Sequence, residues 1–170
     1  MGVNRHKSAV ARPWSRTFLG DTFTTPSQAK LKVAPESVQR FKRRLRERLR
    51  RGRGRHLRRV LAELRPVRRG WVSYVRKSQV RSAFEELDRW IRRTLRCVLW
   101  RQWQRPRTRA TERIRRGLPR EWAWSAATKG RGPWWHAGAG HMNQAVPTRY
   151  LSQLGLVSLS QEAHRLERFI

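Results

Sequence analysis

The sequence predicts a mainly α-helical bundle with a short N-terminal β-hairpin and an irregular C-terminal tail. Apolar residues recur at helical spacing through the middle of the chain. Pro and Gly interrupt that spacing at intervals of about one helix length. Short runs of β-forming residues occur in the first 34 positions. With 170 residues, the chain has the length of one ordinary domain and can bury a core.

The N-terminal part predicts a hairpin followed by a helix. Residues 18–24, "FLGDTFT", and 30–34, "KLKVA", are rich in β-forming residues. Two strands alone are marginally stable, so this hairpin needs other elements to pack on. A helix is expected from Pro35 to residue 51, because proline is well tolerated in a first turn. Its apolar stripe consists of Val38, Phe41, Leu45 and Leu49. The arginines away from this stripe are Arg40, Arg43, Arg44 and Arg51.

Two more helices are expected on either side of Pro66, because proline inside a helix removes a hydrogen bond and clashes with the preceding turn. The first carries Leu57, Val60, Leu61 and Leu64. The second has a predicted core stripe of Val67, Trp71, Tyr74 and Val75. Trp71 and Tyr74 are expected to hold this helix against its neighbours. The alternative is stacking on an unpaired base, as in single-strand-binding proteins, and Tyr74 could do both if its hydroxyl reaches a phosphate.

The longest helix is expected from Ser82 to about Trp103. Ser82 and Glu85 have the spacing of a capping box, and the acidic residues at 85–88 fall where the helix dipole favours negative charge. Its apolar positions are Phe84, Leu87, Ile91, Leu95 and Val98. Its opposite side carries Arg89, Arg92, Arg93, Arg96 and Arg101.

The remaining sequence predicts shorter elements. A short helix is expected around Ile114, and residues 119–135 are expected to form one helix followed by a Gly and Pro turn. Short helical pieces are expected in the tail near 141–146 and 160–168. Cys97 is the only cysteine, which excludes an intrachain disulfide and a Cys-rich zinc site, and we expect it to be a small buried core residue.

The chain is strongly basic. Its 41 Lys and Arg against 11 Asp and Glu give a formal charge of +30. The net charge is +4 over residues 1–39, +23 over 40–116 and +3 over 117–170. A compact chain of this charge repels itself unless a polyanion is bound, and basic helix faces in one segment are typical of nucleic-acid binding. No apolar run has the length of a membrane span and no apolar signal region is found at the N-terminus. We therefore expect a cytoplasmic protein with no membrane partner.

No catalytic or metal site is predicted. A two-metal polymerase or nuclease gathers carboxylates around a cation, whereas the acidic cluster at 85–88 is explained by helix capping. The five histidines have no metal-ligand spacing, and "HAGAGH" places two of them in a glycine loop. The "GRGP" at 130–133 follows no expected strand and precedes no Lys-Ser/Thr pair, so it is not a phosphate loop. We expect binding without a cofactor.

Several runs resemble a known family. "FKRRLRERLRR", "LAELRPVRRGWVSYVR", "FEELDRWIRRTLRCVLWRQWQRPRTR" and "GRGPW" resemble the thumb, or maturase-specific domain X, of group II intron-encoded reverse transcriptases. "KSAVARPWSRTFLG", at 7–20, resembles the end of the palm, and "LGL", at 154–156, resembles the C-terminal segment. The resemblance implies a palm end with the β-hairpin at 1–34, a thumb-like maturase-specific helical domain at 35–128 and a C-terminal extension at 129–170.

The resemblance implies an RNA-binding maturase domain that grips structured group II intron RNA and assists its folding and splicing. In that family the RNA is its own catalyst, and in the intact enzyme the thumb also holds the primer-template duplex. The signature positions expected to be mainly structural are Gly70, Trp71 and Tyr74. The arginines expected to contact RNA are Arg43, Arg44, Arg51, Arg69, Arg76, Arg92, Arg93, Arg96, Arg107 and Arg109.

The chain also departs from the family. It lacks the fingers and most of the palm, including the Tyr-x-Asp-Asp motif, and has no Cys-rich or HNH-like endonuclease segment. Although the family is one of RNA-directed DNA polymerases, we expect a truncated member that does not polymerise alone. Asp21 stands after "FLG" where the family usually has an apolar or aromatic residue.

Three hypotheses remain open from the sequence. The chain is a maturase domain, free-standing or acting in trans; or it is the thumb of a split reverse transcriptase whose fingers and palm come from a separate polypeptide; or it is a decayed fragment of a mobile genetic element.

Overall fold

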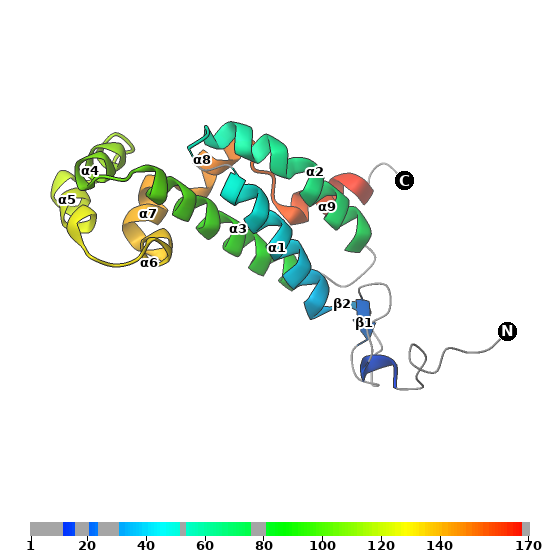
Figure 1. The fold of residues 1–170 in the computed structure, drawn as a ribbon. Helices are drawn as coiled ribbons and strands as arrows, with labels where there is room; N and C mark the ends of the chain where they lie inside the picture. The colour runs from blue at the N-terminus through cyan, green and yellow to red at the C-terminus, as the bar shows by residue number, and fades with distance from the viewer. Residues whose placement is uncertain (1–11, 16–20, 24–30, 52–53, 76–80, 168–170) are drawn as a thin grey trace.

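The computed structural model describes residues 12–15, 21–23, 31–51, 54–75 and 81–167 of the chain, and these form a mainly helical fold (Figure 1). A short 3-10 helix, η1, spans Pro13–Ser15, and two strands follow, β1 Asp21–Phe23 and β2 Leu31–Val33. The long helices are α1 Pro35–Arg51, α2 Leu57–Val75 and α3 Arg81–Gln102. The shorter helices are α4 Pro106–Ile114, α5 Arg120–Thr128, α6 Pro133–Gly138, α7 Gly140–Ala145, α8 Thr148–Gln153 and α9 Leu159–Glu167. The predicted fold class is confirmed.

The predicted hairpin is present in the described residues. β1 and β2 pair antiparallel, with Asp21 opposite Val33 and Phe23 opposite Leu31. Val33 is buried and belongs to the same hydrophobic core as the helices. This contact supplies the packing partner that a two-stranded hairpin needs. The parts of the two predicted strands at 18–20, 24 and 30 lie outside the described residues.

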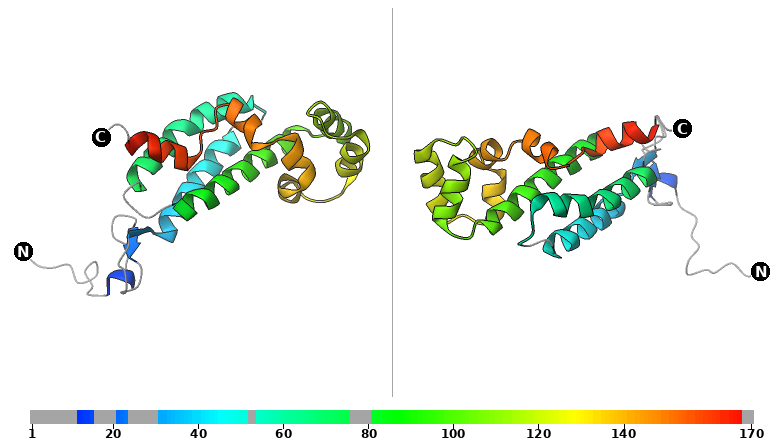
Figure 2. Two further views of the ribbon diagram at one scale, coloured as in Figure 1. Left: turned by 180° about the vertical axis from the view of Figure 1, so that it is seen from behind. Right: turned by 90° about the horizontal axis from the view of Figure 1, so that it is seen from above.

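Helix α3 is the centre of the molecule. Its 22 residues extend over roughly 33 Å. Figure 2 shows α1 and α9 on opposite sides of α3, with α2 packed against both. The group of short helices α4 to α7 lies at the C-terminal end of α3, where α6 packs directly on it. Among the described residues, no helix combines the length and apolar composition of a membrane span.

Pro66 does not end a helix, contrary to the sequence-based expectation. It lies inside α2, which continues from Leu57 to Val75. Pro66 is exposed, so its ring points away from the core. The buried residues on both sides of it lie on one continuous stripe: Leu57, Leu61, Leu64, Val72 and Val75. Packing along that stripe offsets the backbone hydrogen bond that proline removes.

The start of α3 also differs from the expectation. Because α3 begins at Arg81, Ser82 lies inside the first turn and does not precede the helix as a cap. A capping box is found instead at α9, where Ser158 Oγ accepts the Gln161 N–H at 3.1 Å and Ser158 N donates to the Gln161 side chain at 3.3 Å.

The C-terminal tail is built from short helices. The pieces expected near 141–146 and 160–168 correspond to α7 and α9, and α8 and α6 are additional. Met142, Leu151 and Leu159 are fully buried in the main hydrophobic core. Cys97 is buried, as expected.

Candidate nucleic-acid interface

Helix α1 has one apolar face and one arginine face. Phe41, Leu45 and Leu49 are spaced by four residues, and all three are buried. The other positions carry six exposed arginines: Arg40, Arg43, Arg44, Arg46, Arg48 and Arg50. None of the six has a hydrogen bond or ion pair with any residue that the structure describes. We call these six residues the arginine ridge.

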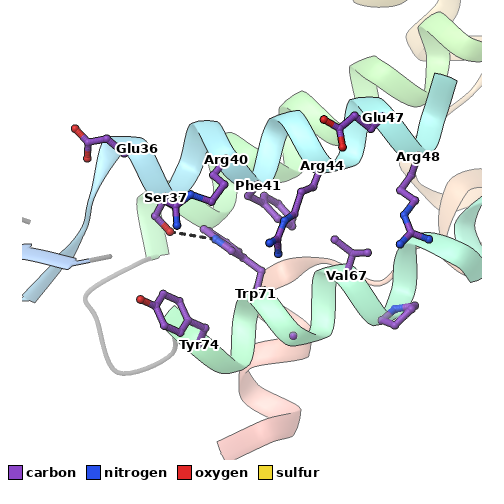
Figure 3. A pocket seen from close by; sticks show the side chains of 12 residues that line it. Glu36, Ser37, Arg40, Phe41, Arg44, Glu47, Arg48, Val67, Trp71 and Tyr74 are labelled. Atoms are coloured by element: carbon purple, nitrogen blue, oxygen red, sulfur yellow. Dashed lines mark hydrogen bonds between the residues drawn. The ribbon is translucent and has the colours of Figure 1, made fainter. Parts of the chain in front are cut away.

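One groove runs along each side of the arginine ridge. The first, the α1–α2 groove, has a volume of about 840 Å³. Arg40, Arg44 and Arg48 line it from α1, and Trp71 and Tyr74 line it from α2. In Figure 3, Arg44 and Arg48 extend from α1 toward α2, whereas the acidic side chains on its rim project away from α2. A ligand in this groove therefore meets guanidinium groups and aromatic rings.

Trp71 forms part of the wall of the α1–α2 groove and joins three helices. Its ring stacks on Phe41 of α1, with centroids 4.3 Å apart and planes 15° from parallel. Its ring centroid lies 5.9 Å from that of Phe84 of α3, in an edge-to-face arrangement. The indole N–H donates to Ser37 Oγ at 3.4 Å, as Figure 3 shows. The packing role expected for Trp71 is confirmed by these contacts.

Tyr74 does not pack in the core, and that part of the expectation is wrong. Its side chain is 54% exposed, because a position three residues after Trp71 is rotated toward the open edge of the groove. Gly70, also on the groove, is exposed, and a Cβ built there would meet nothing within 4 Å. The structure therefore shows no packing requirement for glycine at this position.

The second groove, the α1–α3 groove, lies on the other side of α1 and has a volume of about 810 Å³. Arg46 and Arg50 line it from α1, Trp90 and Arg101 from α3, and Trp134 from α6. The Arg46 guanidinium lies 5.2 Å from the centre of the Trp90 ring. The lining of the α1–α3 groove contains no acidic residue, whereas Glu36 and Glu47 line the α1–α2 groove.

The arginines predicted to contact RNA fall into three groups. Arg43, Arg44, Arg69 and Arg107 are exposed, and Arg92 is half-buried. Arg69 has a partner, since its Nε lies 3.8 Å from a carboxylate oxygen of Glu162. The side chain of Arg51 and the whole of Arg76 lie outside the described residues. The structure brings Arg43 and Arg44 together on the ridge and places Arg69, Arg92 and Arg107 elsewhere.

The third group, Arg93, Arg96 and Arg109, binds within the protein. Arg96 is 8% exposed and its Nε donates to the Val146 carbonyl at 2.9 Å. It does not lie on a solvent-facing side of α3 as expected, because the segment before α8 covers it. Burial lowers its pKa. Arg109 donates to the Trp103 carbonyl at 2.7 Å.

Arg93 fastens α6 to α3. Its Nε and Nη2 donate to the Trp134 carbonyl at 3.2 and 3.0 Å, and its guanidinium lies 4.4 Å from the centre of the Trp134 ring. A Cβ on Gly138 would lie 2.8 Å from Arg93 Cζ, so glycine leaves room for this contact. Arg93 thus positions Trp134 at the α1–α3 groove.

A buried charged cluster holds α9 and was not predicted. The carboxylate oxygens of Asp88 accept the Leu159 N–H at 3.1 and 3.0 Å, so Asp88 satisfies a free amide at the start of a helix 71 residues away. Arg68 and Glu162 are buried nearby. Burial raises the pKa of Asp88 and lowers that of Arg68, whose nearby carboxylates act in the opposite direction. No local pattern in the sequence could show this pairing.

Two histidines expected in a glycine loop instead form a buried pair. His136 stacks on Trp100, with centroids 3.7 Å apart, and its Nε2 lies 3.2 Å from the Lys129 carbonyl. Because a carbonyl can only accept, Nε2 donates and the neutral His136 accepts at Nδ1 from His141 Nε2, 3.2 Å away. Burial and the neighbouring Arg113 lower the pKa of His141 to about 4. Among the described residues, no three His, Cys, Asp or Glu side chains are placed to hold a metal ion.

Residues 38–118 match the family model of the group II intron, maturase-specific domain. The match begins in α1 and ends just after α4, so it includes the arginine ridge and the helices α2 and α3 that wall the two grooves. No curated protein matches the chain.

Proposed function

Because residues 38–118 belong to the maturase-specific domain family of group II introns, we propose that this chain binds structured group II intron RNA and assists its folding and splicing. The observation that supports this most is the arginine ridge, with six exposed guanidinium groups that have no acidic partner in the described residues. The proposed contact set includes Arg43 and Arg44 on the ridge, with Arg92 and Arg107 beyond it. Arg96 and Arg109 are left out because they bind backbone carbonyls within the fold.

The proposed mechanism is electrostatic. Folding a large RNA brings its phosphates close together, and they repel one another. Cations bound between the phosphates reduce this repulsion and so lower the free energy of the folded RNA. A guanidinium can bind phosphate through two parallel hydrogen bonds, and a helix packed on a hydrophobic core fixes the backbone positions of six arginines along its exposed face. The protein then stabilises the folded RNA, which in the family that this sequence resembles carries out splicing itself.

Selectivity is the first test. Binding is measured at about 0.15 M salt to a group II intron RNA and to an unrelated folded RNA of equal length. We expect tighter binding to the intron, faster splicing at low Mg²⁺ with protein present, and a linear fall of log affinity with log salt that corresponds to roughly 5–10 phosphates. Equal affinity for both RNAs and no gain in splicing across several introns would refute the proposal.

A charge-matched pair of variants locates the interface. Arg40→Gln with Arg44→Gln removes two charges from the ridge and the α1–α2 groove. Arg58→Gln with Arg65→Gln removes two exposed charges from α2 that line neither groove. We expect the first pair to weaken RNA binding and to reduce the salt slope by about 2, since each lost phosphate contact removes about 1. The second pair should change both quantities much less. Equal effects would mean that binding depends on total charge and not on the ridge.

We expect the isolated chain to have no polymerase activity, because the described residues offer no carboxylate group for two metal ions. The measurement is primer extension with Mg²⁺ or Mn²⁺ on RNA and DNA templates. Template-dependent extension that is lost in Asp88→Asn would contradict this expectation. A separate fingers-and-palm polypeptide as partner stays a prediction from the resemblance, to be tested by co-purification.

A further inference from the structure

The α1–α3 groove combines two kinds of surface. Arg50 and Arg101 supply positive charge, and no acidic residue lines the groove. Leu49, Cys97 and Val98 form an apolar part of the lining. A ligand that fits this combination has an anionic part and a flat or apolar part.

Trp134 is placed to receive a flat ligand. It lines the groove, and 43% of its surface is exposed. The Arg93 guanidinium lies over its ring at 4.4 Å, and two hydrogen bonds from Arg93 to the Trp134 carbonyl hold the residue in place. An aromatic side chain held rigidly by a cation, and still exposed, loses little conformational entropy when a ring stacks on it.

The other wall aromatic, Trp90, is attached to the arginine ridge. Lys42 and Arg46 lie over its ring at 5.7 and 5.2 Å. The groove therefore lies directly beside the ridge, with Arg46 and Arg50 shared by both, and an RNA backbone that follows the ridge reaches the groove without leaving the positive surface.

We propose that the α1–α3 groove binds an unpaired nucleotide of the RNA, with its base stacked on Trp134 and its phosphates on Arg50 and Arg101. This inference rests on the proposed function, since it assigns a subsite to the same bound RNA. Stacking on aromatic side chains beside a positive groove is the physical basis of single-strand binding. A base in a duplex cannot enter, because both of its faces are covered by neighbouring base pairs. The volume of about 810 Å³ leaves room for a nucleotide.

The α1–α2 groove is less suited to this role. One face of Trp71 is stacked on Phe41, and the ring edge packs on Phe84. The lining of this groove includes two carboxylates, Glu36 and Glu47, whereas the lining of the α1–α3 groove includes none. We therefore assign duplex backbone contacts to that side of the ridge and the unpaired nucleotide to the α1–α3 groove.

The test uses two RNAs that differ only in unpaired nucleotides: a blunt hairpin and the same hairpin with a short single-stranded uridine overhang. Affinities of the full chain are measured by fluorescence anisotropy at about 0.15 M salt. Trp134→Leu is the test variant. Trp124→Leu is the matched control, because Trp124 is 39% exposed on α5 and lines neither groove.

We expect Trp134→Leu to weaken binding of the overhang RNA by at least about fivefold, the lower end for loss of one stacked base. Binding of the blunt hairpin should change less than about twofold, and Trp124→Leu should leave both affinities unchanged. Because Trp134 also holds Arg93, circular dichroism and the urea midpoint check that the variant folds. If it does not fold, Arg101→Gln at the rim gives the same test, and we expect it to weaken overhang binding more than blunt binding.

The outcomes separate this inference from the proposed function. If the chain binds intron and unrelated RNA equally but loses overhang binding in Trp134→Leu, the groove proposal stands and the maturase proposal fails. If the chain selects intron RNA but both groove variants bind the overhang as the parent does, the groove proposal is overturned. The groove proposal would also be overturned if an acidic peptide bound in the α1–α3 groove and added RNA did not displace it.

Discussion

Removing the ring of Trp71 should destabilise the fold, because this ring connects α1, α2 and α3. Trp→Ala in a core costs about 3–5 kcal/mol. Trp71 is half-buried and its hydrogen bond to Ser37 is long, at 3.4 Å, so the lower end applies. The stacked contact with Phe41 contributes about 1 kcal/mol of this loss beyond the buried area. We therefore expect Trp71→Ala to cost about 3 kcal/mol.

The assay is unfolding in urea and by heat, followed by circular dichroism. For a chain of this length, a loss of about 3 kcal/mol lowers Tm by roughly 6–12 °C. Tyr74→Ala is the control, because Tyr74 is 54% exposed and its loss should cost less than about 0.5 kcal/mol. If Trp71→Ala unfolds with the parent while losing RNA affinity, the ring acts in base stacking and the core assignment is wrong. A large loss in Tyr74→Ala would equally contradict the packing described for α2.

Three further predictions concern buried polar groups. The folded protein lowers the pKa of His141 to about 4, below the ordinary histidine value near 6.5. The stability that the neutral ring contributes is therefore complete above pH 6.5, and about 3 kcal/mol of it is lost as the pH falls toward 4. Urea midpoints should fall with pH across this range, and His141→Gln should make them depend less on pH. Asp88→Ala removes the carboxylate that accepts from the first amide of α9 and lies near the buried guanidinium of Arg68, and should lower the free energy of unfolding by about 3 kcal/mol. Hydrogen exchange should show faster opening of α9. Asp88→Asn keeps an acceptor oxygen and should lower the free energy of unfolding by less. Arg113 is fully buried; its Nε donates to the Arg109 carbonyl at 2.8 Å, but both terminal nitrogens are unpaired among the described residues. Arg113→Met should therefore unfold at the same or a higher urea concentration. A loss of stability above about 2 kcal/mol would show that the terminal nitrogens have partners in solution.

Much of the fold follows from local sequence. The four-residue spacing of Phe41, Leu45 and Leu49 is sufficient to predict α1, because apolar residues on one stripe must be buried together. Spacings of three and four residues predicted that Phe84, Leu87, Ile91 and Leu95 are buried in α3, and all four are. Val98, the last residue of that predicted stripe, is half-buried. The concentration of charge between residues 40 and 116 predicts where an anion binds, because repulsion among cations acts whatever the detailed packing.

The candidate site was only partly predictable. Arg43 and Arg44 were expected on the surface and lie there, since a helix carries their side chains away from its apolar stripe. Arg96 has the same local pattern and is buried, because the Val146 segment covers that side of α3. Trp134 was not predicted at the site. It is far from α1 in sequence, so no local pattern indicates that it lies on the same groove as Arg46 and Arg50.

The sequence by itself determined the helical periods, the basic segment and the resemblance to a family, because each of these depends on residues within a short window. Only the tertiary structure decided that α2 continues through Pro66, that Asp88 caps α9 and that α6 completes the α1–α3 groove. These features depend on which distant segments meet. A local propensity of about 1–3 kcal/mol, such as the cost of proline in a helix, is overcome when packing of a continuous buried stripe stabilises the helix by more than that amount. The segment against which the stripe packs is distant in sequence, so no short window of sequence contains it.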